Sequence, residues 1–269
     1  MLTYIKQGWK STLGQFHLVL LLFLYQFAWG FALYRFIESI VYPLLRRYPG
    51  DALEAASSQL FWAESQFRLL KTGMAAPYLW MIAGLFALRM LATPFINAGL
   101  YYALHQGRSE KFKFFKGMRR HGGMISLFYW TQIVLTIAPA AWILTNFPEW
   151  IARRGSYSDI AVSALPYLIG WLVYGFLLQQ LFLYLQLGRT AELPYTRTLR
   201  IVIRHALQIA GLSLSVMAAA AAVVALTGTF SWLWAGLFAL IAHQSYHLGR
   251  TLFKIWTIAS HYHFLQAKA

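Results

Sequence analysis

The chain has 269 residues, of which 59% are hydrophobic and 12% charged, and its mean hydropathy is +0.52. A water-soluble domain carries roughly 45–50% apolar and about 25% charged residues, so this excess must face a bilayer. The composition excludes a soluble enzyme, a disordered chain and a disulfide-stapled secreted module. The chain has no cysteine, which excludes disulfides, thiolate metal sites and thiol nucleophiles.

The formal net charge is +15, a value that invites a nucleic-acid interpretation. However, the basic residues cluster between long apolar runs, which is how topology signals are arranged in membrane proteins. We therefore expect no nucleic-acid partner.

Six stretches are long and apolar enough to cross a hydrocarbon core of about 30 Å. They cover residues 16–45, 75–104, 124–147, 160–187, 206–226 and 230–258, with a tight turn expected at Gly228. The first stretch runs past Trp29 without a small-residue cleavage site, so we expect an uncleaved signal anchor. The sequence predicts an all-α, polytopic transmembrane bundle of six helices that forms one integral membrane domain over residues 1–269.

Lysine and arginine are distributed unequally between the two sides of the predicted bundle. Fifteen flank the spans on the side of the two termini, six lie on the opposite side, and Arg35 and Arg89 lie within helices. The positive-inside rule then places both termini in the cytoplasm.

The first outer loop contains a predicted amphipathic helix. Asp51 and Glu54 have the spacing of a capping box, and apolar residues recur from Leu53 to Leu70 at steps of three and four. Such a helix packs on the membrane surface or the bundle, or covers a substrate path as a lid.

A basic pair at i, i+4 precedes each odd-numbered span: Lys6 with Lys10, Lys116 with Arg120, and Arg200 with Arg204. This spacing favours three repeated hairpins, although any cytoplasmic segment that leads into a span carries basic residues. The pairs belong to a predicted cytoplasmic basic surface that suits anionic lipid headgroups or an acidic partner. Its members are Lys6, Lys10, Lys113, Lys116, Arg119, Arg120, Arg197, Arg200 and Arg204.

Two segments carry a family resemblance: SEKFKFFKGMRR at residues 109–120 and LFKIWTIA at residues 252–259. With six spans and cytoplasmic termini, the chain resembles uncharacterised bacterial six-helix membrane proteins related to the membrane domain of some glycerophosphodiester phosphodiesterases. The resemblance implies a fold and a bacterial inner (plasma) membrane. It implies no catalytic residue, because the phosphodiesterase activity belongs to a soluble domain that these residues do not contain. A permease subunit of the exporter type is a second, weaker likeness.

Arg89 is the strongest single candidate for a functional residue, since a charge within a span is costly and marks substrate paths. Asn97 lies eight residues on, roughly on the same helical face, with Pro94 between them. Either such an arginine receives an anionic substrate or lipid headgroup, or it is structural. A structural arginine is bonded to carbonyls, Tyr or Gln, or extends its charged group to an interface. Glu38 is its nearest acidic option, but Arg35 and Glu38 at i, i+3 can satisfy each other.

His243 and His247 share a helical face and form a weak candidate metal site. A catalytic zinc needs a third ligand and a general base, and no acidic residue lies on this helix. We expect no cofactor. His261 and His263 fall in a predicted cytoplasmic tail.

Three classes of function follow. The leading one is a non-enzymatic membrane subunit or scaffold that acts through a partner membrane or ATPase subunit. The second is a transporter or permease component for an anionic or lipidic solute, with Arg89 in the pathway. The third is a membrane-embedded, metal-dependent enzyme that uses the face of His243 and His247.

Overall fold

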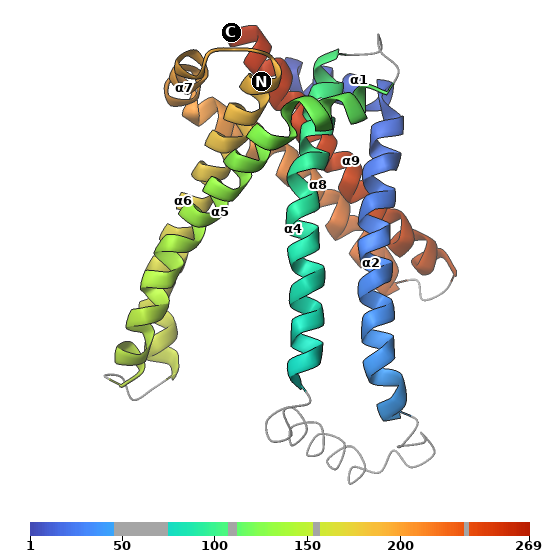
Figure 1. The fold of residues 1–269 in the computed structure, drawn as a ribbon, viewed down its shortest axis with the longest axis vertical. Coiled ribbons are helices and arrows are strands. Elements are labelled where there is room, and N and C mark those ends of the chain that lie inside the picture. The colour runs from blue at the N-terminus through green and yellow to red at the C-terminus, as the bar shows by residue number, and fades with distance from the viewer. Residues whose placement is uncertain (46–74, 107–111, 153–156, 234–236) are drawn as a thin grey trace. The chain divides into compact units, whose positions relative to one another are not determined.

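The computed structural model describes residues 1–45, 75–106, 112–152, 157–233 and 237–269. Within these ranges the chain is helical and contains no strand. The helices are α1 (Leu2–Gly14), α2 (Phe16–Leu45), α4 (Ala75–Gln106), α5 (Lys113–Ala152), α6 (Tyr157–Thr190), α7 (Tyr195–Arg204), α8 (Ala206–Leu233) and α9 (Leu237–Lys268) (Figure 1). The predicted outer amphipathic helix lies outside the described residues.

Five of the described helices have the length and hydropathy needed to cross a membrane. The candidate spans are Phe16–Ser39, Ala76–Gln106, Lys113–Thr145, Ala164–Thr190 and Ala206–Thr229. Each coincides with one of the first five predicted stretches. Helix α9 covers most of the predicted sixth stretch, but its described residues do not meet the same criterion. The described part of the chain is therefore all-helical and contains several apolar helices suited to a membrane.

Two helix boundaries differ from the prediction. Helix α8 continues through Gly228 to Leu233, so the expected turn at Gly228 is wrong. Helix α5 begins at Lys113, so the basic segment and the apolar span that follows form one continuous helix. A single glycine or a change in polarity does not by itself end a helix.

The chain divides into two compact units. The second unit, Leu21–Thr93, contains most of α2 and the first part of α4. Tyr25 Oη lies 3.4 Å from Thr93 Oγ1 near one end, and the rings of Phe36 and Tyr78 lie 6.5 Å apart near the other. As residue numbers rise along α2 they fall along α4, so these two segments form an antiparallel hairpin.

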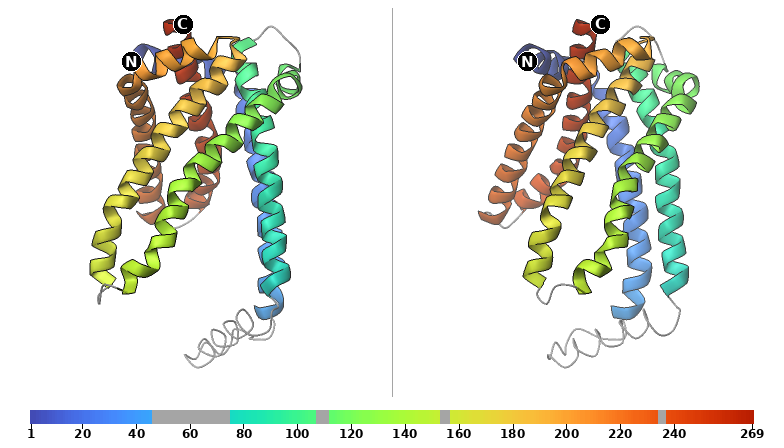
Figure 2. Two further views of the ribbon diagram at one scale, coloured as in Figure 1. Left: turned by 60° about the vertical axis from the view of Figure 1, so that its left-hand side comes forward. Right: turned by 90° about the vertical axis from the view of Figure 1, so that its left-hand side faces the viewer.

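The first unit comprises Met1–Leu20 and Pro94–Ala269, and it contains most of the buried core. Both chain termini lie at one end of this unit, beside α7 (Figures 1 and 2). The buried apolar side chains belong to segments that reach this end: residues 18–19, 98–104, 114–125, 182–187, 201–216 and 255–265. By contrast, α5, α6 and α8 expose large apolar side chains farther along, including Leu144, Leu172 and Leu226. This division is typical of helices whose outer surface faces lipid.

Candidate functional site at the basic end of the first unit

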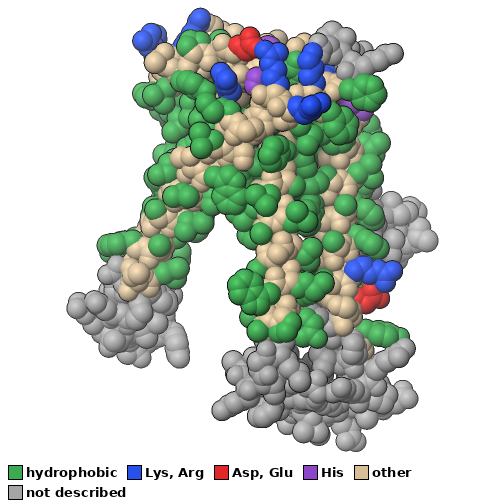
Figure 3. Space-filling view, viewed as in Figure 1, with side chains coloured by type: hydrophobic (Ala, Val, Ile, Leu, Met, Phe, Trp, Pro, Cys, Tyr) green, Lys and Arg blue, Asp and Glu red, His purple; other side chains and the backbone are tan. Residues whose placement is uncertain are grey.

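Three helical segments carry basic side chains at the end of the first unit that holds both termini. We call them the basic helices: α1, residues 113–121 of α5, and α7. Lysine, arginine and histidine side chains gather there in Figure 3. Of the nine predicted members of the basic surface, eight are exposed, whereas Lys113 is buried with 6% of its surface accessible. Lys113 is thus part of the interior and not of the surface on which it was predicted.

The basic helices also expose large apolar side chains among their charges. Leu2, Phe115 and Ile203 are 73%, 57% and 70% exposed. Exposed apolar groups interleaved with lysine and arginine are typical of helices that lie in the headgroup region of a membrane.

Single non-helical residues set α1 and α7 apart from the long helices that follow them. Gln15 (φ −122°, ψ 39°) separates α1 from α2, and His205 (φ −118°, ψ 23°) separates α7 from α8. The backbone of each residue leaves the helical region, so the short helix takes its own direction. In α5 the basic segment is instead continuous with the long helix.

Each basic helix packs closely on a different long helix through a glycine. A Cβ added to Gly8 of α1 would lie 2.7 Å from the backbone nitrogen of Ser260 in α9. One added to Gly117 of α5 would lie 3.1 Å from the carbonyl oxygen of Ala98 in α4. The glycine of the third contact is on the long helix, where a Cβ at Gly188 of α6 would lie 2.5 Å from Thr198 Oγ1 of α7. Glycine permits these approaches because it has no side chain.

Three consecutive residues of α9 each bond to different helices. His261 contacts α6 and α8, since its Nδ1 lies 3.0 Å from Tyr184 Oη and its Nε2 lies 2.8 Å from Ser213 Oγ. The Tyr262 hydroxyl lies 2.9 Å from His105 Nδ1 of α4. His263 Nε2 lies 2.7 Å from Ser11 Oγ of α1. Successive helical residues point about 100° apart, so these three residues reach helices on different sides of α9. The end of α9 therefore connects α1, α4, α6 and α8.

The expectation that His261 and His263 lie in a tail beyond the last helix is therefore wrong, because both residues belong to α9. His261 has no exposed surface, and Phe264 and Leu265 are 1% and 0% exposed. A sequence signal for this burial exists, because the apolar stripe that includes Ile255 and Ile258 continues at helical spacing to Leu265.

Burial lowers the pKa of His261 to about 4, so its imidazole is neutral at physiological pH. One ring nitrogen of a neutral imidazole donates and the other accepts, and the two hydroxyls can satisfy either tautomer. The pair of Ser213 and His261 has the distance of a nucleophile and its general base. Both residues are buried, however, so we interpret the cluster as structural.

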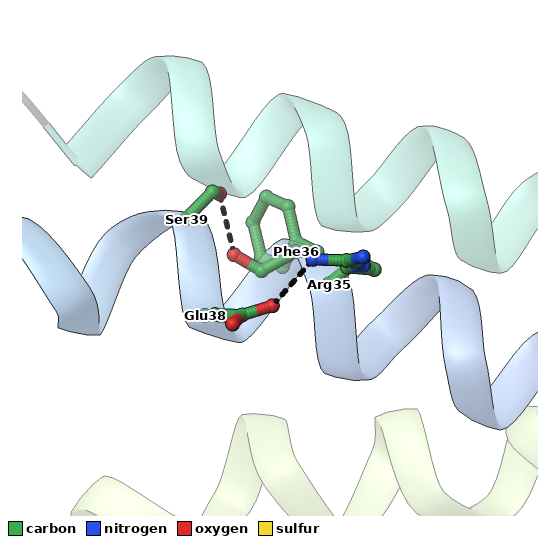
Figure 4. Close-up of polar contacts among 4 residues, drawn as sticks. All are labelled: Arg35, Phe36, Glu38 and Ser39. Carbon is green, nitrogen blue, oxygen red and sulfur yellow. Dashed lines mark hydrogen bonds and ion pairs between the residues drawn. The ribbon is translucent and has the colours of Figure 1, made fainter.

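The predicted substrate residues lie in different units. Arg89 is exposed on the part of α4 in the second unit, and its guanidinium has no hydrogen bond or ion pair within the described residues. Asn97 is half-buried in the first unit. Arg35 Nη1 donates to Glu38 Oε2 at 3.1 Å, and Ser39 Oγ donates to the Phe36 carbonyl at 2.6 Å (Figure 4). The predicted pairing of Arg35 with Glu38 is confirmed, so Glu38 has a partner other than Arg89.

The candidate metal ligands are both on α9. The His247 side chain is exposed, whereas the side chain of His243 lies outside the described part of the structure. Among the residues that the structure describes, no group of three or more histidine, aspartate or glutamate side chains could hold a metal ion.

Comparisons with known proteins found no matching family model, no matching curated protein and no matching solved structure.

Proposed function

We propose that the chain is a non-enzymatic subunit or scaffold of a bacterial inner membrane that acts through a partner at its basic end. In this proposal six spans form three hairpins, with both termini and the basic helices in the cytoplasm. Anionic lipid headgroups and an acidic surface of a partner membrane or ATPase subunit both suit such an end.

One observation carries the proposal: the basic helices expose their charges while close packing holds them on the core. Lys6 and Lys10 are exposed on α1, whereas Gly8 between them is buried against α9. On α7, Arg197 and Arg200 are exposed and Thr198 is buried against α6. A charged face supported by a packed face is preorganised for binding, which lowers the entropy lost when a partner docks.

The test is co-purification of the intact protein from its native membrane, followed by mass spectrometry of bound proteins. Arg197→Glu combined with Arg200→Glu reverses the charge of an exposed face, so we expect loss of a stoichiometric partner. The matched control, Arg197→Lys with Arg200→Lys, conserves charge and should retain that partner. Absence of any stoichiometric protein from the wild-type preparation, or its retention by the glutamate variant, would contradict the proposal.

A transporter or permease component for an anionic or lipidic solute is the second candidate, favoured by the exposed Arg89. A charge near the middle of a span costs a few kcal/mol or more, and such residues mark solute paths. In proteoliposomes with fluorescent phosphatidylglycerol as the probe, Arg89→Lys should slow lipid movement without loss of folded protein. Arg35→Gln is the control, because Arg35 already has Glu38 as its partner. Full activity in Arg89→Ala would exclude this candidate.

A further inference from the structure

His121 is a buried residue of the basic end with an incomplete set of hydrogen bonds. It follows Arg119 and Arg120 on α5 and is 6% exposed. Its Nε2 is buried and has no hydrogen-bond partner among the residues that the structure describes. Leaving a buried polar atom without a partner is energetically unfavourable, so this nitrogen requires a ligand or a functional role as its explanation.

The ring of His121 lies among charged groups from two helices and the turn between α6 and α7. Arg120 on α5 and Arg189 in the last turn of α6 are close enough to act electrostatically on the imidazole. Glu192 and His105 also act on it. Arg120 Nη2 donates to Glu192 Oε1 at 2.8 Å, and both side chains are more than half exposed. Among the described residues, two guanidinium groups and one carboxylate give a net positive charge near the buried nitrogen.

Close packing holds the imidazole in place. Its ring centroid lies 5.6 Å from that of Tyr102 on α4. The next residue, Gly122, approaches the Phe95 ring so closely that an added Cβ would lie 2.7 Å from it. The side chain that follows the basic pair of α1 provides a contrast, since Ser11 Oγ lies 2.7 Å from His263 Nε2. A side chain of the same chain therefore completes the hydrogen bonding of Ser11 on α1, whereas no described residue does so for His121 Nε2 on α5.

We propose that His121, Arg120 and Arg189 form a binding site for a phosphate-bearing anion. An imidazole N–H and two guanidinium groups provide several hydrogen-bond donors, and guanidinium groups match phosphate oxygens in charge and geometry. Phosphate can come from a lipid headgroup or from a soluble phosphate compound. This proposal does not require the proposed partner subunit, because all three residues of the site belong to the first unit of this chain.

The experiment uses the full chain with ¹⁵N-labelled histidine in phosphatidylcholine nanodiscs. Inorganic phosphate is titrated in one arm, and phosphatidic acid is included in the disc lipid in the other. The His121 imidazole signal, assigned with His121→Gln, should shift with the anion. A shift with phosphatidic acid alone assigns the site to a lipid headgroup, and a shift in both arms assigns it to phosphate anions in general.

Two exposed arginines separate a specific site from general electrostatic attraction. Arg189→Gln should weaken the response of His121 at least tenfold, whereas Arg200→Gln on α7 should leave it unchanged. The signal of buried His261 reports folding in every sample, since it should stay at the wild-type position. No shift in either arm, or equal weakening by the two variants, would overturn the proposal.

Discussion

His261 illustrates how one residue can organise the end of a helical bundle. Its two ring nitrogens contact hydroxyls from α6 and α8, and it has no exposed surface. Protonation would turn both nitrogens into donors within an apolar environment, which burial opposes. The half-buried His263 responds in the same direction, because burial lowers its pKa as well.

Stability should therefore fall as the medium becomes acidic. Below the ordinary histidine pKa of 6.5 the unfolded chain binds a proton, whereas folded His261, with a pKa of about 4, does not. This difference should remove about 2 kcal/mol of stability by pH 5 and on the order of 3 kcal/mol near pH 4. The check is the thermal midpoint in detergent at pH 7.5 and pH 5. His261→Gln cannot titrate and should show a smaller decrease; an equal decrease would contradict the assignment.

At the scale of single residues, composition predicts exposure better than it predicts partners. Lys116 and Arg119 are exposed as expected from their charge, but Lys113 on the same helix is buried. The sequence also contains every residue of the His261 cluster. Along the chain, 29 residues separate Tyr184 from Ser213 and 48 separate Ser213 from His261. Whether these residues meet depends on which helices pack together. Hydropathy measures the preference for lipid or water and carries no information about that choice.

At the scale of elements, the contact between α1 and α9 should tolerate no added methyl group. A Cβ at Gly8 would lie 2.7 Å from the Ser260 backbone nitrogen and 2.9 Å from its Cα. Because both are backbone atoms, no movement of a side chain can relieve the clash. We expect Gly8→Ala to lower the free energy of unfolding by about 1–3 kcal/mol, measured from thermal or denaturant unfolding in detergent. Gly123→Ala is the control, because a Cβ added there would meet no described residue within 4 Å apart from its own turn of helix. A stable Gly8→Ala protein would show that α1 does not dock here.

The contact between α6 and α7 should respond differently, because a side chain causes its clash. A Cβ at Gly188 would lie 2.5 Å from Thr198 Oγ1 and 3.0 Å from its Cγ2. Gly188→Ala should therefore destabilise the protein, and Thr198→Ala in the same chain should restore most of the loss. A double-mutant cycle of unfolding free energies measures this rescue. Ser260→Ala should give Gly8→Ala no comparable rescue, so equal rescue at both contacts would contradict the distinction.

At the scale of the whole molecule, hydropathy predicted where the long helices lie but not how each is continued. The first predicted stretch, residues 16–45, coincides with α2, because about 20 apolar residues in lipid must satisfy their backbone bonds as a helix. The separation of α1 at Gln15 and the continuity of α5 past its basic segment depend on packing against α9 and α4. Those contacts join residues far apart in the chain, so a local pattern could not reveal them.

The orientation of the whole chain gives the last prediction. With fifteen basic residues predicted on the side of the termini and six on the other, the termini should lie in the cytoplasm. The chain has no cysteine, so one introduced cysteine is the only site that a maleimide can label. In cells with an intact inner membrane, an impermeant maleimide should label Ser58→Cys in the predicted outer loop. Leu199→Cys, which is exposed on α7, should react only after that membrane is permeabilised. The reverse pattern would place the basic helices outside the cell and remove the electrostatic basis for a cytoplasmic partner.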